Sequence, residues 1–268
     1  MKKIWRLSPL FLVSVALMFA FACSSDEEAA STSDASTAAP AAAPVAESTK
    51  GPGASKQAKG TIVFAQSTLQ CPHGINTVYC GAYDSVAWGI GEDLFTWRWK
   101  DGGGIDYEAG QIAESYTLSD DLSTLSIKIR SGVQFHKGFG DMTADDVVHS
   151  YNKTNPMITP HSIAPSAANF ASLFGSNPAV ANGQNVDFQF ENFDVAWVNN
   201  LMNTGGFVGV VIHSKKAFDQ NDEAWAKENV IATGPYEVES WIRDDTAVFN
   251  AWDGHWEFPN PQARKVIV

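Results

Sequence analysis

The sequence is short of positive charge and of nucleotide-binding motifs. It has 18 lysines and arginines against 30 aspartates and glutamates, a formal net charge of −12 over 268 residues. A surface this acidic repels phosphate backbones, so we expect no nucleic-acid partner. No Gly-x-x-x-x-Gly-Lys-Ser/Thr loop occurs, so the chain shows no sign of hydrolysing ATP itself.

Hydrolase motifs are also absent. The sequence lacks both Gly-x-Ser-x-Gly and the zinc-protease pattern His-Glu-x-x-His. Its paired aspartates are neighbours along the chain, at Asp120-Asp121, Asp145-Asp146 and Asp244-Asp245. Adjacent side chains point apart in a strand or turn, so these pairs cannot set a general acid against a base. We therefore expect neither an enzyme nor a bound cofactor.

Cysteine is scarce, with three residues in the whole chain. Cys71 and Cys80 bound the short stretch CPHGINTVYC, which also holds His73. In an oxidising compartment the two cysteines would form a disulfide or stay as inert thiols. A metal site on Cys71, His73 and Cys80 is disfavoured because no fourth ligand with zinc-like spacing follows nearby.

The N-terminal apolar run, from Leu10 to Ala22, is too short to span a bilayer comfortably. It follows a basic start, which predicts a signal peptide over residues 1–22, and its removal would take the net charge to −15. The end, Ala20-Phe21-Ala22-Cys23, resembles the lipobox of bacterial lipoproteins, in which Cys23 becomes the lipidated first residue. The lipobox prefers Leu where Ala20 stands and a small residue where Phe21 stands, so plain secretion is the alternative.

Residues 23–59 are rich in Ala, Ser, Thr, Pro and Gly and hold no aromatic residue. Such a segment cannot bury enough apolar surface to offset the entropy lost on ordering. We predict a lipid-anchored, disordered tether between the membrane and a domain that begins at residue 60.

Strand and helix patterns mix from residue 60 onward, which predicts an α/β fold. Strand patterns occur at residues 60–68, in a hairpin over 112–135 with its turn at Ser119-Asp120-Asp121, at 186–194, in two strands around Asp244-Asp245, and at 263–268. Residues 86–104 predict a helix or loop that ends in a short aromatic strand and a glycine turn. Residues 207–219 predict an apolar strand that leads into a helix.

Residues 126–154 contain a strand, a glycine turn and a helix start in one run. Thr143 precedes Asp145 and Asp146, which suits an N-cap followed by acids in the positive first turn of a helix. His136, Asp146 and His149 could be imagined as metal ligands. That reading is weak because Asp146 is already explained by the helix start, and we expect no metal there.

The same run resembles the signature of the bacterial extracellular solute-binding proteins of family 5, the substrate-binding lipoproteins of peptide-importing ABC transporters. The resembling residues are Arg-x-Gly-Val-x-Phe-His at 130–136 and Thr-Ala-Asp-Asp-Val-Val-x-Ser at 143–150. The later ATGPYEVESW and NAWDGHWEFPNPQARKVIV resemble a second landmark of that family, in the right order. Departures are His255 where Tyr is usual, Ala232 where Gly is usual, and a longer turn over residues 137–142.

The resemblance implies a lobe like that of a type II periplasmic binding protein, a mixed sheet flanked by helices. It implies a protein with two such lobes that close on a peptide and dock on a permease and ATPase. Nickel complexes, metallophores or other small solutes are the alternative ligands, and a secreted hydrolase is the rival from another class. Ligand contacts are expected at Thr68, Gln70, Trp97, Trp99 and Trp256.

Members of this family are usually about twice as long as this chain. We therefore expect residues 60–268 to be the N-terminal part of the binding domain, with the second lobe missing through a truncated gene or a sequence fragment. The terminal Lys-Val-Ile-Val would then end as an open sheet edge. The chain alone would fold partly, bind peptide weakly or not at all, and tend to associate through its exposed apolar wall.

Overall fold

A computed structural model of the chain describes residues 43–44, 60–67, 69, 88–162, 164, 166–198 and 210–268. The chain divides into the units Met1–Ala39 and Pro40–Val268, and every described residue lies in the second unit. The predicted signal peptide and nearly all of the predicted tether therefore fall outside the described residues. So do five residues of the sequence prediction: Cys23, Thr68, Gln70, Cys71 and Cys80.

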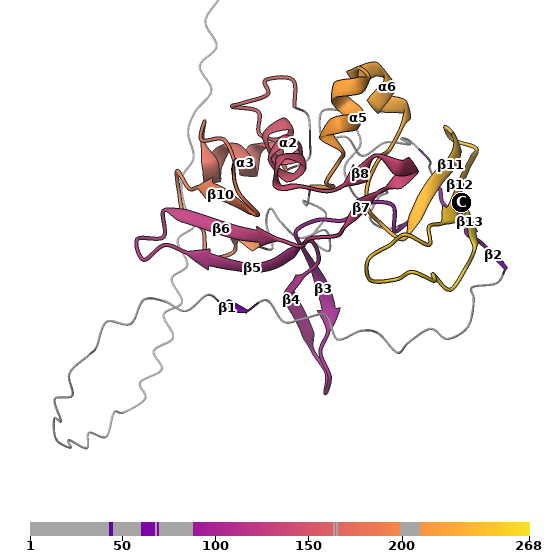
Figure 1. Ribbon diagram of the computed structural model, residues 1–268, viewed down its shortest axis with the longest axis horizontal. Coiled ribbons are helices and arrows are strands. Elements are labelled where there is room, and N and C mark those ends of the chain that lie inside the picture. The colour runs from indigo at the N-terminus through magenta and orange to yellow at the C-terminus, as the bar shows by residue number, and fades with distance from the viewer. Residues whose placement is uncertain are drawn as a thin grey trace, which may run out of the picture. The chain divides into compact units, whose positions relative to one another are not determined.

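The larger sheet has the strand order β1-β5-β6-β10-β9, and its neighbouring strands are all antiparallel (Figure 1). Its strands are β1 (Ala43–Pro44), β5 (Ala113–Leu118), β6 (Thr124–Ile129), β9 (Val180–Asn182) and β10 (Asn185–Gln189). The predicted hairpin is confirmed as β5 and β6. In β6, Leu125, Ile127 and Ile129 are buried while the alternate positions are half-buried, so the period-two pattern marks the core face.

Helices α2 (Ala144–Thr154) and α3 (Ala167–Phe174) lie over this sheet (Figure 1). Tyr151 of α2 and Phe174 of α3 both pack against Phe188 of β10, with ring centroids 5.1 and 5.6 Å apart. The sequence predicted α2 but not α3, which lies in a segment rich in Ser, Ala, Asn and Pro. These contacts make one hydrophobic core from the helices and the sheet.

Thr143 and Asp146 form the predicted helix start, a capping box at the N-terminus of α2. One oxygen of the Asp146 carboxylate accepts hydrogen bonds from the backbone N and the Oγ1 of Thr143, both at 2.8 Å. Its other oxygen accepts from the backbone N of Lys215 at 2.8 Å. Lys215 begins helix α5 (Lys215–Gln220), so Asp146 joins two helices and acts as scaffold.

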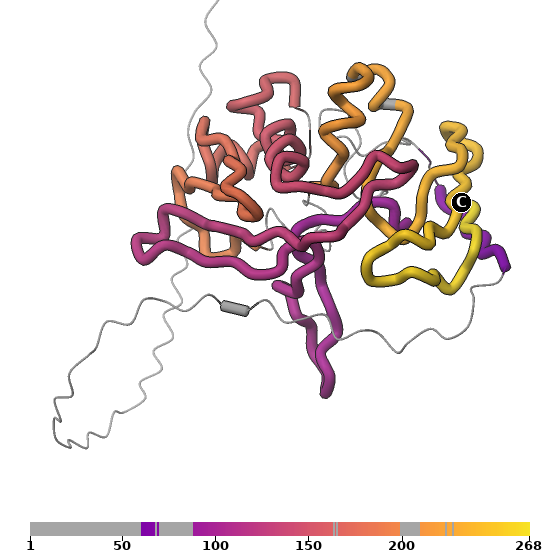
Figure 2. The backbone as a smooth tube through the Cα atoms, in the orientation of Figure 1, coloured from indigo at the N-terminus to yellow at the C-terminus, as the bar shows by residue number. Residues whose placement is uncertain are grey.

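The smaller sheet has the order β11-β12-β13-β2 and is mixed, because β13 pairs antiparallel with β12 and parallel with β2. Its strands are β11 (Tyr236–Ile242), β12 (Thr246–Ala251), β13 (Lys265–Ile267) and β2 (Thr61–Val63). Figure 2 shows the indigo residues of β2 beside the yellow C-terminal strands. The expectation that the last strand ends as an open edge is therefore wrong: β13 is an inner strand because β2 supplies its second neighbour.

Two strand pairs stand apart from these sheets. The aromatic strand is confirmed as β3 (Phe95–Trp99), which pairs with β4 (Ile105–Gly110) in a hairpin that projects from the larger sheet (Figure 1). The other pair is β7 (Gln134–Phe135) and β8 (Gly140–Asp141), separated by the short helix η1 (His136–Gly138). Among the described residues, no helix is long and apolar enough to cross a membrane.

The segment before α5 differs from the prediction. Residues 210–213 were expected to be the end of an apolar strand, but they are irregular, and the backbone N of Ile212 donates to the carbonyl of Glu92 at 3.0 Å. The predicted helix is confirmed as α5, and helix α6 (Glu223–Glu228) follows it. Val210, Val211 and Ile212 are fully buried, so the apolar run serves burial without sheet pairing.

Candidate functional site

The chain passes between its two hydrophobic clusters at residues 90–94. Ile90 belongs to the smaller cluster and Leu94 to the larger one. Between them stand Glu92 and Asp93, whose exposures are only 2% and 0%. Carboxylates are rarely this buried unless they are paired or hydrogen-bonded. The contacts of these two acids therefore define the candidate site.

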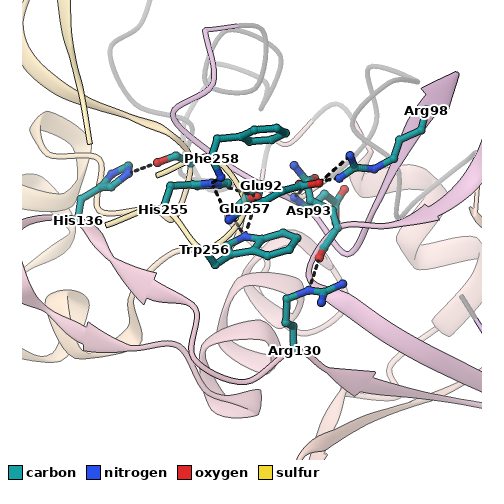
Figure 3. Close-up of polar contacts among 11 residues, drawn as sticks. Glu92, Asp93, Arg98, Arg130, His136, His255, Trp256, Glu257 and Phe258 are labelled. Atoms are coloured by element: carbon teal, nitrogen blue, oxygen red, sulfur yellow. Dashed lines mark hydrogen bonds and ion pairs between the residues drawn. The ribbon is translucent and has the colours of Figure 1, made fainter. Parts of the chain in front are cut away.

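Glu92 joins this segment to the loop of residues 252–258 (Figure 3). Its carboxylate accepts from the indole Nε1 of Trp256, at 3.1 and 3.2 Å to the two oxygens, and lies 3.2 Å from Nε2 of His255. The other ring nitrogen of His255, Nδ1, accepts from the backbone N of Glu257 at 3.2 Å and of Phe258 at 2.8 Å. The buried acid thus fixes both an aromatic ring and a loop.

Two arginines hold the same loop from other elements (Figure 3). Arg98 of β3 makes a bidentate ion pair with Glu257, with N–O distances of 2.9 and 2.8 Å. The guanidinium of Arg130 lies 4.3 Å from the centre of the Trp256 ring, and its Nε donates to the carbonyl of Gln111. Planar guanidinium groups favour both kinds of contact. The loop is therefore tied to the β3–β4 hairpin and to the end of β6.

Asp93 points into the larger core and accepts three hydrogen bonds. These come from the backbone N of Leu94 at 2.6 Å, the hydroxyl of Tyr151 at 2.7 Å and the backbone N of Val210 at 2.9 Å. Burial outweighs these bonds and raises the pKa of Asp93 to about 7. Burial, with the nearby Asp93, also raises the pKa of Tyr151 well above its ordinary value.

Glycines make the close approach of these segments possible. A Cβ on Gly234 would lie 2.3 Å from the carbonyl oxygen of Gly89, and a Cβ on Gly91 would lie 2.5 Å from a methyl carbon of Val211. Gly234 is the glycine of the Gly-Pro-Tyr motif. The carbonyl of Gly234 also accepts a hydrogen bond from Nε2 of His136 at 2.8 Å. The second sequence landmark is therefore the place where backbone packs directly on backbone.

The structure does not bring the three predicted tryptophans together. Trp256 is half-buried against Glu92 and Arg130. Trp97 and Trp99 lie on the projecting hairpin with exposures of 41% and 81%, and Trp97 packs edge-on against Tyr107. The assignment of all three tryptophans as ligand contacts stays a prediction.

Sequence reasoning missed Glu92 and Arg130 as parts of this arrangement, and noted His255 only as a departure from the family pattern. A signal did exist for Glu92 and Asp93. Two adjacent acids inside the apolar run Gly-Ile-Gly-Glu-Asp-Leu-Phe, at residues 89–95, indicate buried carboxylates. Their partners could not be read from the sequence, because Trp256 is 164 residues away from Glu92.

The residues weighed as metal ligands have other contacts. His136 donates to Gly234 and packs on Trp252, and burial lowers its pKa to about 4. His149 packs on the ring of Phe218, and its pKa is also lowered to about 4 by burial. Within the described part of the chain, no three His, Cys, Asp or Glu side chains are placed to hold a metal ion. The arrangement around Glu92 instead holds the ring of Trp256 and the guanidinium of Arg130 in place.

The fold defines a class of protein: the chain has the fold of part of one lobe of a type II periplasmic binding protein. It is similar to the ABC transporter-associated periplasmic binding protein DppA from Helicobacter pylori, solved with the peptide STSA. The two are 19% identical with a TM-score of 0.58, and the match covers 79% of this chain and 43% of that one. The chain belongs to the bacterial extracellular solute-binding proteins, family 5, whose middle-region model matches residues 109–268. This family points to a binding protein rather than an enzyme.

Curated relatives agree with this assignment. The chain is 24% identical over 160 residues to the dipeptide-binding protein of Escherichia coli strain K12, a match covering 54% of this chain and 29% of that protein. It is also 24% identical over 151 residues to the glutathione-binding protein GsiB of Shigella boydii, covering 54% of this chain and 26% of that one. The matched region thus spans less than a third of the length of either curated relative.

Proposed function

We propose that this chain is part of the extracytoplasmic substrate-binding component of an ABC importer, and that its ligands are short peptides. The observation that carries the proposal is the family match over residues 109–268. Its relatives include a protein named for dipeptides and another named for glutathione, which is itself a small peptide. The proposal includes no nucleic-acid partner, because the acidic chain would repel a phosphate backbone.

In this proposal Trp256 is part of the wall that contacts the ligand. Aromatic rings with a few placed polar groups suit peptides of variable side chain. Trp97 and Trp99 contribute through the outer face of the hairpin, and Thr68 and Gln70 through the segment after β2. Ligand that touches two lobes favours the closed form by its differential affinity, and the closed form docks on the permease and its ATPase.

Calorimetry of the exported chain against peptide libraries of two to five residues tests the ligand class. We expect weak but saturable binding of peptides, because this chain forms only part of one lobe, and we expect the peptides to be recovered intact by mass spectrometry. Saturable binding of a nickel complex, a metallophore or another solute in place of peptides would overturn the peptide assignment. Cleaved peptides would instead identify a hydrolase.

We further propose that the chain is exported and anchored. Signal peptidase would act after Ala22, Cys23 would carry the lipid, and residues 24–59 would be the tether to the outer face of the membrane. Cys71 and Cys80 would pair in that oxidising compartment. Mass spectrometry of the mature N-terminus tests the anchor, because an unacylated residue 23 or a different first residue would exclude it.

A further inference from the structure

The two ring nitrogens of His255 have different roles. Nδ1 faces two donors, the backbone N–H groups of Glu257 and Phe258, so it must be an unprotonated acceptor. In a neutral imidazole the proton then lies on Nε2, which donates it to the carboxylate of Glu92. His255 is 3% exposed as a whole residue, and its ring stacks on Phe258 with centroids 5.4 Å apart. The surroundings therefore select the Nε2–H tautomer.

This one imidazole connects three parts of the molecule. Through Nε2 it reaches Glu92, the same carboxylate that holds the indole N–H of Trp256. Through Nδ1 it fixes the backbone of Glu257, whose side chain pairs with Arg98 of the β3–β4 hairpin. A shift of this ring would therefore move the aromatic wall and the attachment of the hairpin together.

We propose that His255, in its Nε2–H tautomer, is the residue that positions Trp256 and the loop of residues 255–258 for ligand capture. The ligand part of this inference rests on the proposed function. The charged and titratable groups around the imidazole are Glu92 at Nε2, Glu257 and its partner Arg98 beside Nδ1, Arg130 on the far side of Trp256, and His136 near the same loop.

A packing role alone predicts something different. If the ring only filled space, any side chain of similar size would serve, and the two nitrogens would not matter separately. A positioning role requires the acceptor at Nδ1 more than the donor at Nε2. The reason is that Glu92 keeps the Trp256 N–H as a donor when Nε2 is lost, whereas the two backbone amides lose their shared acceptor when Nδ1 is lost.

Two substitutions separate these nitrogens. In His255→Asn the side-chain oxygen lies near the place of Nδ1, where asparagine commonly accepts from backbone N–H groups two or three residues on. In His255→Gln the side-chain nitrogen reaches towards Glu92, but no acceptor remains at Nδ1. The pair is matched, because both variants carry a neutral amide and lack the ring.

Hydrogen exchange of the full chain gives the first result. We expect the amides of Glu257 and Phe258 to exchange about tenfold faster in His255→Gln than in the wild type, because both amides lose the acceptor that they share at Nδ1. In His255→Asn they should stay within about threefold of the wild type. Peptide affinity should follow the same order, with about a tenfold loss in His255→Gln, which corresponds to ~1.4 kcal/mol. Equal effects of the two variants would show that the ring merely fills space.

The wild-type chain provides a test that does not depend on folding of the variants. Nitrogen-15 NMR distinguishes the two imidazole tautomers, and the signal absent from His255→Asn identifies this histidine. We expect a protonated Nε2 and an unprotonated Nδ1, and the opposite tautomer would overturn the inference. Failure of the proposed function looks different: the wild type would bind no peptide, while the tautomer and the exchange pattern would remain as stated.

Discussion

Removal of the Asp146 carboxylate should destabilise the protein much more than removal of its neighbour. Asp146 is 6% exposed and accepts three hydrogen bonds that join the start of α2 to the start of α5. Asp145 stands in the same first turn but is exposed. The substitutions Asp146→Ala and Asp145→Ala change the net charge and the helix dipole interaction alike, so their difference isolates the buried hydrogen bonds.

Hydrogen bonds to charged groups contribute roughly 1.5–3 kcal/mol each, and water that enters the truncated site recovers part of that loss. We therefore expect Asp146→Ala to lower the free energy of unfolding by about 3 kcal/mol, a large share of the 5–15 kcal/mol typical of domains. For a domain of this size that corresponds to a Tm lower by roughly 6–12 °C. Asp145→Ala should cost under about 1 kcal/mol.

Urea and thermal unfolding of the full chain, followed by circular dichroism, measure this difference. Asp146→Asn provides an intermediate case, because it keeps one oxygen acceptor and loses the charge. If Asp146→Ala and Asp145→Ala agree to within about 0.5 kcal/mol, the three hydrogen bonds do not stabilise the fold and the scaffold role is wrong.

Three further predictions follow from single positions. Gly234→Ala would bring a Cβ within 2.3 Å of a backbone oxygen, so it should lower the free energy of unfolding by more than about 3 kcal/mol. Gly183→Ala, at a positive φ in open space, should lower it by about 1 kcal/mol. Urea unfolding measures both variants, and similar midpoints would contradict this prediction. Because burial raises the pKa of Asp93 from its ordinary value of 3.8 to about 7, its protonated form stabilises the fold at low pH, and that stability is lost as pH rises from about 4 to about 7. The unfolding free energy of Asp93→Asn relative to that of the wild type should therefore rise over that range, and a pH-independent difference would refute it. Trp256→Phe removes the indole N–H from a buried carboxylate and should cost about 1–3 kcal/mol, while Trp99→Phe, at an 81% exposed position, should change stability by less than about 0.5 kcal/mol in the same unfolding assay.

Local signals in the sequence determined the elements whose stabilising contacts lie within a few residues. The turn between β5 and β6 is one such case, because Ser119 and Ser123 both donate to the carboxylate of Asp121. The start of α2 is another, since Asp146 contacts Thr143 three residues earlier. The order of the two family landmarks also predicted the protein class, because each landmark needs only its own short run of residues.

Only the tertiary structure decided how distant segments meet. Helix α3 lies in a segment whose composition predicted no helix, and Phe174 packs it on β10. Strand β13 gains a second neighbour from β2, about 200 residues earlier in the chain. A local sequence pattern cannot predict this pairing. The tryptophans show the same limit. Trp99 lies exposed on a hairpin, whereas Trp256 lies beside a buried carboxylate. The side chains are identical, and their burial differs because it depends on what the rest of the chain places around each ring.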